Sequence, residues 1–561
     1  MKIETVAQAY LELLSLRGVD YFFANAGTDF ASIVDAFAYR QEQGKHSPQP
    51  LTIPHEIPLI AMAHGYYLIT GKPQVAMVHV GVGTANALGG IINAHRSRIP
   101  ILFSAGRTPI TEDGNPVFRY PFIHWGQESF DQAGMLREYV KWDYELKTPS
   151  QLESVVERAF AISLSEPQGP VYLVLPQEVM ISPQSEASFS MQSCYDQPTF
   201  YPDFHKIKEA SNLLSKAKYP LIITSSLGRS HKAVQSLIEL ADTGVIGVIS
   251  FNPEYMNFPT DHPYHLGFVP DPHLSKADVI LVVDCDVPWY PKMTKPRDSA
   301  IIIQAGIDPF FSCYPFRSFP SHLTLQGSTE IILSDIAHSI TEHPERNENT
   351  FKVRETKLKK THDDMIQKWH ETPLYDPHKP LSFELISYHV NQILRDDIVV
   401  VNEYSFIPTE CKHPGSYFST SHAGYLGWGV GAALGIKLAL PDKTVVATVG
   451  DGCYMFSVPS ACHYVSAAHK LPILIIVYNN QGWNAVKIST RALYPDGWAV
   501  KTNNFPLTDL KPVSNYEKIC EAYGGYGERV TSSDQLQPAL ERALNVVKNE
   551  KRQALLNVIC Q

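Results

Sequence analysis

The sequence predicts an α/β protein built from three doubly wound parallel-sheet domains. Short runs rich in Val and Ile, most of them ending in Gly or Asn, alternate with segments of helix length. This alternation is typical of parallel sheets, in which a crossover helix connects successive strands. The chain has 561 residues, more than a single hydrophobic core usually serves. We therefore expect several sheets in one chain.

The predicted strands fall into three blocks that share this pattern. In the first block they are Gly18–Gly27, Leu51–Glu56, Gln74–Gly81, Ile99–Gly106 and Gly169–Pro176. In the second they are Tyr219–Ser226, Gly244–Phe251, Ala277–Cys285, Ser299–Gly306 and Ser321–Gly327. In the third they are Asp396–Tyr404, Lys443–Gly452, Pro472–Asn480 and Ala554–Gln561.

Two polar segments separate the blocks. Glu186 to Asp203 is rich in Ser and Pro and has no hydrophobic period, which is typical of a linker. His343 to His378 is strongly charged, and we expect an exposed, partly helical connector there. The predicted domains accordingly comprise residues 1–185, 196–342 and 375–561.

The composition narrows the classes of partner. The hydrophobic share is 44%, the charged share is 19% and the net charge is −10, without a long basic run. This balance argues against nucleic acid or an anionic membrane as a partner. The N-terminus lacks the layout of a signal peptide, and no stretch has the length of a membrane span. The eight cysteines show no CxxC or zinc-like spacing, so we expect reduced thiols in a cytoplasmic protein.

The most informative motifs end two runs of the third block. Gly450-Asp451-Gly452 follows one run and Asn479-Asn480 the next, with 26 residues between them. One crossover helix fits in that interval, which predicts that the two loops lie side by side. Carboxylate and amide oxygens suit Mg²⁺, and the glycines allow backbone N–H groups to approach phosphate closely. We expect the segment Tyr454 to His469 to be helical, with its positive N-terminal end facing the same phosphates.

The GDG motif followed at this distance by NN resembles the thiamine diphosphate signature of the 2-oxo acid decarboxylase and acetohydroxyacid synthase superfamily. The likeness extends along the chain and implies pyrimidine-binding, central and diphosphate-binding domains, in that order. It also implies that Asp451, Asn480 and the carbonyl of Gly482 bind Mg²⁺. Gly450, Gly452, Cys453, Asn480 and Gly482 are the residues expected to bind the diphosphate part of the cofactor.

Glu56 is the candidate catalytic acid of the first block. It is expected to close the strand Leu51–Glu56 and so to lie at the carboxyl edge of the sheet, where ligands bind in open α/β sheets. In the family, a Glu at this point bonds a nitrogen of the cofactor's aminopyrimidine ring and promotes the tautomer that activates the thiazolium carbon. That role requires a carboxyl group shielded from water. The alternative from the sequence alone is an ordinary acidic residue at a helix start.

The segment Gly424 to Gly429 resembles the family stretch that bends the cofactor into its V shape. The resemblance makes Leu426 the apolar wedge and the Gly424 carbonyl the acceptor for the 4′-amino group. Taken alone, Leu426 is better explained as a core residue. Glu403 is expected to line the same cleft.

Candidates on the substrate side come from the first block. Thr28 and Asp29 follow its first strand, at the loop where family members carry Asp or Ser facing substrate. His79 ends another strand, at the point where benzoylformate decarboxylases carry a His that assists proton transfer. A structural histidine is the alternative.

Three departures from the family pattern favour carboligation or an unusual substrate. The paired histidines of pyruvate decarboxylases are not visible between Ala105 and Trp125. Val287 to Tyr290 stands where benzoylformate decarboxylases bring a second His from the central domain. Val486 stands where pyruvate decarboxylases have Glu. A bound FAD is compatible with the resemblance, but no glycine-rich phosphate motif indicates one.

The resemblance thus implies thiamine diphosphate- and Mg²⁺-dependent decarboxylation or carboligation of 2-oxo acids, with a second 2-oxo acid or an aldehyde as acceptor. A homodimer or homotetramer is implied, because in the family Glu56 of one subunit meets Asp451 and Asn480 of another. Alternatives are a non-decarboxylating C–C lyase or diketone hydrolase, a catalytically silent cofactor-binding subunit, and a synthase with a regulatory subunit.

Overall fold

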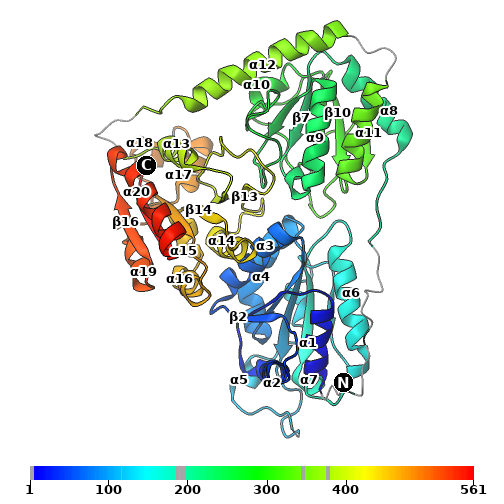
Figure 1. Cartoon of the computed structure of the whole chain (residues 1–561), viewed down its shortest axis with the longest axis vertical. Helices are drawn as coiled ribbons and strands as arrows, with labels where there is room; N and C mark the ends of the chain where they lie inside the picture. The colour runs from blue at the N-terminus through cyan, green and yellow to red at the C-terminus, as the bar shows by residue number, and fades with distance from the viewer. Residues whose placement is uncertain (1–4, 115, 185–188, 190–196, 343–347, 375–379) are drawn as a thin grey trace. The chain divides into compact units, whose positions relative to one another are not determined.

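The computed structural model describes residues 5–114, 116–184, 189, 197–342, 348–374 and 380–561. It contains three parallel sheets with helical connections, which confirms the predicted α/β class (Figure 1). Chain contacts divide the molecule into two compact units. One comprises residues 1–197, 401–405 and 420–561, and the other residues 198–400 and 406–419. No helix within the described ranges is long and apolar enough to cross a membrane.

The first sheet has the strand order β2-β1-β3-β4-β6-β5. Its five predicted strands are present, and short β5 at the edge was not predicted. The strands are β1 (Tyr21–Ala24), β2 (Gln49–Thr52), β3 (Gln74–Val78), β4 (Ile101–Arg107), β5 (Asp143–Glu145) and β6 (Val171–Pro176). The helices are α1 (Val6–Leu16), α2 (Ala31–Glu42), α3 (Glu56–Thr70), α4 (Val80–Arg96), α5 (Ile123–Gly126), α6 (Leu152–Leu164) and α7 (Gln177–Met180).

The second sheet has the order β11-β10-β9-β7-β8, and all five of its strands were predicted. They are β7 (Pro220–Thr224), β8 (Gly247–Ser250), β9 (Val279–Val283), β10 (Ile301–Gly306) and β11 (Leu323–Gln326). The helices are α8 (Phe204–Lys216), α9 (His231–Gly244), α10 (Asp271–Leu274), α11 (Thr329–Thr341) and α12 (Glu348–His370).

The two predicted connecting segments are only partly described. Most of the predicted linker 186–203 lies outside the described residues, as do the ends of the connector 343–378. Within the connector, α12 is helical as expected, but Arg354 anchors it. This buried guanidinium donates to the carbonyls of Gly244 and Leu214, at the ends of α9 and α8. A cation there complements the negative ends of both helices.

The third sheet has the order β13-β12-β14-β15-β17-β16, and the short β13 and the edge strand β16 were not predicted. Its strands are β12 (Ile398–Glu403), β13 (Tyr417–Ser419), β14 (Thr444–Gly450), β15 (Leu474–Asn479), β16 (Tyr526–Val530) and β17 (Ala554–Ile559). The helices are α13 (Phe383–Ile393), α14 (Trp428–Ala439), α15 (Asp451–Phe456), α16 (Pro459–Ala468), α17 (Asn484–Leu493), α18 (Trp498–Lys501), α19 (Tyr516–Ala522) and α20 (Ser533–Asn545).

The expected single helix over Tyr454 to His469 was wrong. The structure has two helices there, α15 and α16, because Val458 adopts a left-handed backbone (φ 54°) before Pro459. Proline lacks the N–H that would continue a helix and disfavours helical backbone in the residue before it. The first of the two helices begins at Asp451, so the motif itself forms its first turn.

Helices α3 and α14 bring the first and third sheets together through glycine contacts. A Cβ on Gly435 would lie 2.1 Å from the carbonyl oxygen of Met62, and one on Gly65 would lie 2.2 Å from that of Ala432. The helix backbones therefore meet directly. This contact belongs to the same compact unit as both candidate half-sites described below.

Gly435→Ala is expected to lower the free energy of unfolding by about 1–3 kcal/mol, because the added methyl group must push two backbones apart. Chemical denaturation measures the change. The control is Gly126→Ala, where a Cβ would meet nothing within 4 Å. Equal stability of the two variants would show that the helices separate without cost.

Candidate active site

Glu56 lies at the start of α3 rather than at the end of a strand. Strand β2 ends at Thr52, and the ring of His55 caps the helix that Glu56 begins. The predicted strand end was therefore wrong by four residues, although the carboxyl group is buried as expected, with 7% of the residue exposed. Its two oxygens accept hydrogen bonds from the side-chain amides of Asn25 (2.9 Å) and Asn86 (2.6 Å).

These two asparagines were not predicted as site residues. Asn25 follows β1 and Asn86 lies in α4, so they reach Glu56 from two other elements. Nothing in the sequence indicates that their amides converge on one carboxylate. The two neutral amides hold a buried acid in one orientation, and Nδ1 of His55 lies 4.0 Å from the same carboxyl group.

His79 and Asp29 form a pair at the carboxyl ends of β3 and β1. Asp29 accepts from Nδ1 of His79 (2.5 Å) and from the backbone N–H groups of Val80 (3.2 Å) and Gly106 (3.0 Å). The hydrogen bond to Asp29 raises the pKa of His79 above its usual value, against the opposing effect of burial. Thr28 is exposed beside this pair, and its carbonyl accepts from Gln177.

The other ring nitrogen of His79 contacts a residue that the sequence did not single out. Nε2 lies 3.3 Å from the side-chain nitrogen of Gln127. His124 lies in the short helix α5 and Gln127 directly after it, both in the segment that follows β4, and with His79, Asp29 and Thr28 they line one narrow pocket. Burial lowers the pKa of His124. Loop residues of this kind carry no periodic signal, which is why the sequence did not place them.

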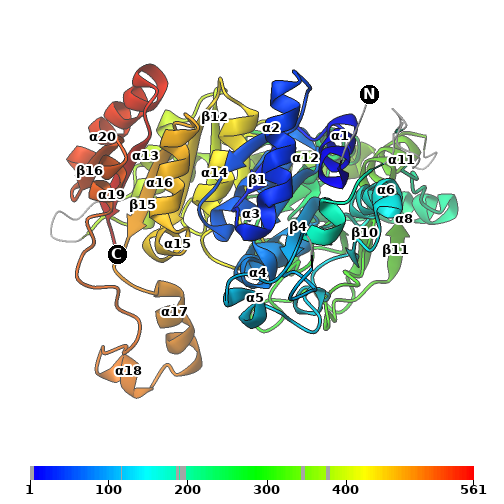
Figure 2. The same ribbon diagram turned by 90° about the horizontal axis from the view of Figure 1, so that it is seen from below.

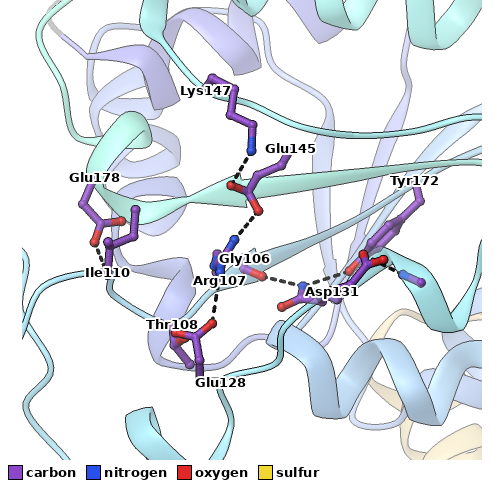
Figure 3. A network of polar contacts seen from close by, with 12 residues as sticks. Gly106, Arg107, Thr108, Ile110, Glu128, Asp131, Glu145, Lys147, Tyr172 and Glu178 are labelled. Carbon is purple, nitrogen blue, oxygen red and sulfur yellow. Dashed lines mark hydrogen bonds and ion pairs between the residues drawn. The ribbon is translucent and has the colours of Figure 1, made fainter.

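A polar network holds the loop that carries Gln127 (Figure 3). Arg107, at the end of β4, donates to Glu128 (3.1 Å) and to Glu145 of β5 (2.5 Å). The hydroxyl of Thr108 donates to the same Glu128 at 2.8 Å, and Arg119 pairs with it as well. Glu128 is the direct neighbour of Gln127, so this network fixes the amide near the ring of His79.

The second half-site lies at the ends of β14 and β15, which are neighbours in the third sheet. The backbone N–H of Gly482 donates both to Asp451 (3.2 Å) and to the side-chain oxygen of Asn480 (3.0 Å). One donor therefore holds the carboxylate and the amide oxygen together. Asp451 is 2% exposed, and burial raises the pKa of its carboxyl group.

The oxygen ligands and N–H groups of this half-site suit a small hard cation and a diphosphate. Asp451 forms no ion pair within the described part of the chain, so its buried charge has no protein cation beside it. One carboxylate, one amide oxygen and a backbone carbonyl are ligands of the kind that Mg²⁺ accepts, with phosphate and water completing its shell. Trp483 covers the turn so closely that a Cβ on Gly452 would lie 2.2 Å from its ring.

The turn that carries Leu426 lies between the third-sheet strands and α15. Gly424 and Gly427 have positive φ angles of 72° and 90°, which glycine adopts without strain. A Cβ on Gly427 would lie 2.4 Å from the carbonyl oxygen of Phe456, so the turn rests on the end of α15. Leu426 is half-buried.

Glu403, at the end of β12, lies behind this turn. It is completely buried, and its oxygens accept from the N–H groups of Gly427 (2.7 Å) and Gly429 (2.8 Å). Burial raises the pKa of Glu403 to about 7, against the opposing effect of these donors and of the Cys453 thiol. Gly450 lies beside Cys453: a Cβ added to Gly450 would be 3.8 Å from Sγ of Cys453.

The predicted residues thus form two groups in one compact unit. Glu56 lies with Asn25 and Asn86, whereas Asp451 lies with Asn480 and Gly482. Across the residues with described positions, no hydrogen bond or ion pair of Glu56 reaches the Asp451 group.

Family models match both groups. The model described as the N-terminal TPP binding domain of thiamine pyrophosphate enzymes matches residues 4–135. The C-terminal TPP binding domain of the same enzymes matches residues 402–558. Together they cover just over half of the chain and include every candidate site residue named above.

Curated relatives and solved structures match nearly the whole chain. The acetolactate synthase large subunit of Haemophilus influenzae is 22% identical, over 97% of this chain and 93% of its own. The 2-hydroxyacyl-CoA lyase 1 of Mus musculus is 24% identical, over 89% and 85% respectively. The benzoylformate decarboxylase of Polynucleobacter necessarius matches with a TM-score of 0.80, at 21% identity over 100% of this chain and 99% of its own.

Proposed function

Because the chain belongs to the thiamine pyrophosphate enzymes, we propose that it is a Mg²⁺-dependent enzyme that decarboxylates 2-oxo acids, joins them to a carbonyl acceptor, or does both. The observation that carries the proposal is the Gly482 N–H shared between Asp451 and Asn480 at the ends of adjacent strands. Asp451, Asn480 and the Gly482 carbonyl would hold Mg²⁺, and Mg²⁺ would hold the diphosphate. The bound cofactor supplies the electron sink for cleavage next to the keto carbon.

In this proposal Glu56 carries a proton for the pyrimidine side of the cofactor. Its burial excludes water, and the two asparagine amides fix its orientation. A general acid or base must reach its partner within hydrogen-bond distance, so a fixed carboxyl group is an advantage. The amides of Asn25 and Asn86 can also turn to present oxygen when Glu56 is protonated.

His79 is proposed to move protons on the substrate side. Asp29 bonds Nδ1, which directs Nε2 of the ring toward Gln127. The side-chain oxygen of Gln127 is buried and has no partner within the described residues. Rotation of this amide would let it donate to neutral His79 or accept from protonated His79. Both protonation states are therefore accommodated in the same pocket, as proton transfer requires.

Asp29→Asn is expected to move the His79-dependent limb of the pH profile of kcat/KM toward lower pH by about one unit. The carboxylate raises the pKa of His79 above 6.5, so its removal lets that pKa fall. Steady-state rates between pH 5 and 9 measure the limb. Asp35→Asn, on the exposed side of α2, is the control. An unchanged profile in Asp29→Asn would remove this pair from the mechanism.

A second copy of the chain is proposed to complete the site. Within the described part of one chain, no hydrogen bond or ion pair joins Glu56 to the Asp451 group, and α17 and α18 have no buried residue. Figure 2 shows α17 and α18 set apart from the strands of the third sheet. Their exposed apolar side chains include Ile488, Leu493 and Trp498, the last 82% exposed. A homodimer would cover such a surface, and the same pairing would bring Glu56 to the metal site.

Product analysis with a panel of aliphatic and aromatic 2-oxo acids tests the proposed reaction. CO₂ together with an aldehyde would identify a decarboxylase, and CO₂ together with a hydroxyketone would identify a carboligase. Cleavage of a 2-hydroxyacyl thioester or of a diketone, with no CO₂ from any 2-oxo acid, would contradict the proposal.

We also propose that residues 1–185, 196–342 and 375–561 are the pyrimidine-binding, central and diphosphate-binding domains.

A further inference from the structure

Glu403 is a buried carboxylate that pairs with no cation. Across the described ranges it forms no ion pair, although it is 0% exposed. Such a charge is costly to bury unless hydrogen bonds replace its hydration. Here the replacement comes from the backbone N–H groups of Gly427 and Gly429, and the thiol of Cys453 also lies close to the carboxyl group.

These groups around the Glu403 carboxyl belong to two different segments. The two N–H groups lie at the start of α14, directly after Leu426, where the helix end carries a partial positive charge. Cys453 lies in α15, two residues after Asp451. One side chain on β12 therefore joins the turn that carries Leu426 to the helix that begins with the GDG motif.

The turn approaches Glu403 closely because two of its residues are glycines. Gly427 is left-handed and rests on the end of α15 at Phe456, and a Cβ on Gly429 would lie 3.0 Å from Oε2 of Glu403. The absence of side chains at both glycines lets the carboxylate approach their N–H groups. The hydrogen bonds to the carboxylate hold these two glycines in one backbone conformation.

We propose that Glu403 is a positioning residue that fixes the Leu426 turn against α15, so that the ring-facing and diphosphate-facing parts of the cofactor site are held as one unit. The inference rests on the proposed function. Glu403 does not itself touch the cofactor, because its oxygens are bonded to protein and no part of the residue is exposed.

The test is Glu403→Gln, which keeps the size of the side chain but turns an NH₂ group toward one of the two N–H donors. Loss of a charge-assisted hydrogen bond is worth about 1.5–3 kcal/mol, so we expect the Kd for thiamine diphosphate with Mg²⁺ to rise about 10- to 100-fold. Calorimetric titration measures it. At saturating cofactor, kcat should fall and the near-ultraviolet circular dichroism of the bound cofactor should change.

Glu157→Gln is the matched control, because Glu157 is also buried but pairs with Arg17 in the first sheet. It should lower Tm without changing cofactor Kd or the dichroism. If Glu403→Gln behaves in the same way, Glu403 is merely structural and the inference is overturned. If the Gln variant does not fold, Glu403→Asp decides: its shorter side chain should raise Kd, and an unchanged Kd would overturn the inference. Failure of the wild-type protein to bind cofactor would instead contradict the proposed function.

Discussion

Glu56→Gln is expected to reduce kcat about 10²- to 10⁴-fold, the usual contribution of a positioned general acid or base, while cofactor Kd changes less than tenfold. Gln fills the same volume, and Asn25 or Asn86 can rotate to accept from its new NH₂ group. The variant therefore loses the exchangeable proton and retains the packing. Steady-state turnover at saturating cofactor, with Kd from titration, separates the two quantities.

The control for this variant is Glu12→Gln in α1, which removes a partly exposed carboxylate paired with Arg40. It should retain normal turnover. Near-normal turnover in Glu56→Gln would remove Glu56 from the mechanism, whereas loss of cofactor binding in that variant would assign it a purely structural role.

Asp451→Asn is expected to abolish Mg²⁺-dependent cofactor binding, with Kd at least about 100-fold higher, yet to leave the free protein as stable or more stable. The reason is that Asp451 is a buried charge without a protein cation, so the isosteric amide removes a cost of folding. The N–H groups of Gly452 and Gly482 bond different oxygens of Asp451, so only one of them keeps an acceptor in the Asn variant, and the loss of the other bond offsets part of this gain in stability. In the wild-type protein, bound Mg²⁺ would neutralise the buried charge of Asp451 and so offset the cost of burying it.

Thermal unfolding with and without Mg²⁺ and thiamine diphosphate checks both halves of this expectation. At a ligand concentration of 100 Kd, binding adds about 2.7 kcal/mol to wild-type stability, and Asp451→Asn should show almost none of that gain. Asp509→Asn is the control, since Asp509 is 58% exposed and pairs with Lys487. A ligand-induced gain of wild-type size in Asp451→Asn would show that the metal binds elsewhere.

Strands that carry β-branched runs ending in Gly or Asn could be predicted from the sequence, and all fourteen predicted segments overlap a strand, although Leu51–Glu56 shares only its first two residues with β2. The missed strands β5, β13 and β16 lack that pattern. For example, β16 is Tyr-Gly-Glu-Arg-Val and is mostly half-buried. An edge strand buries less surface, so its composition is less constrained. The break between α15 and α16 could have been predicted, because Pro459 cannot continue a preceding helix.

Residues that form the candidate site by convergence could not be predicted. Asn25 and Asn86 meet at Glu56 only because β1 and α4 bring them there, and Gln127 meets His79 only through the loop after β4. Glu403 could be placed near the Leu426 turn, but its orientation behind the turn depends on the conformation of Gly427. Sequence identifies motifs at strand ends, whereas contacts between elements require the packed structure.

The measurement that tests the central claim most directly is CO₂ release from 2-oxo acids by protein first dialysed free of Mg²⁺ and thiamine diphosphate. The account predicts no release from the dialysed protein, full release only when both are added back, and little release from Glu56→Gln under the same conditions. Release that persists without added cofactor, or that is equal in Glu56→Gln, would contradict it.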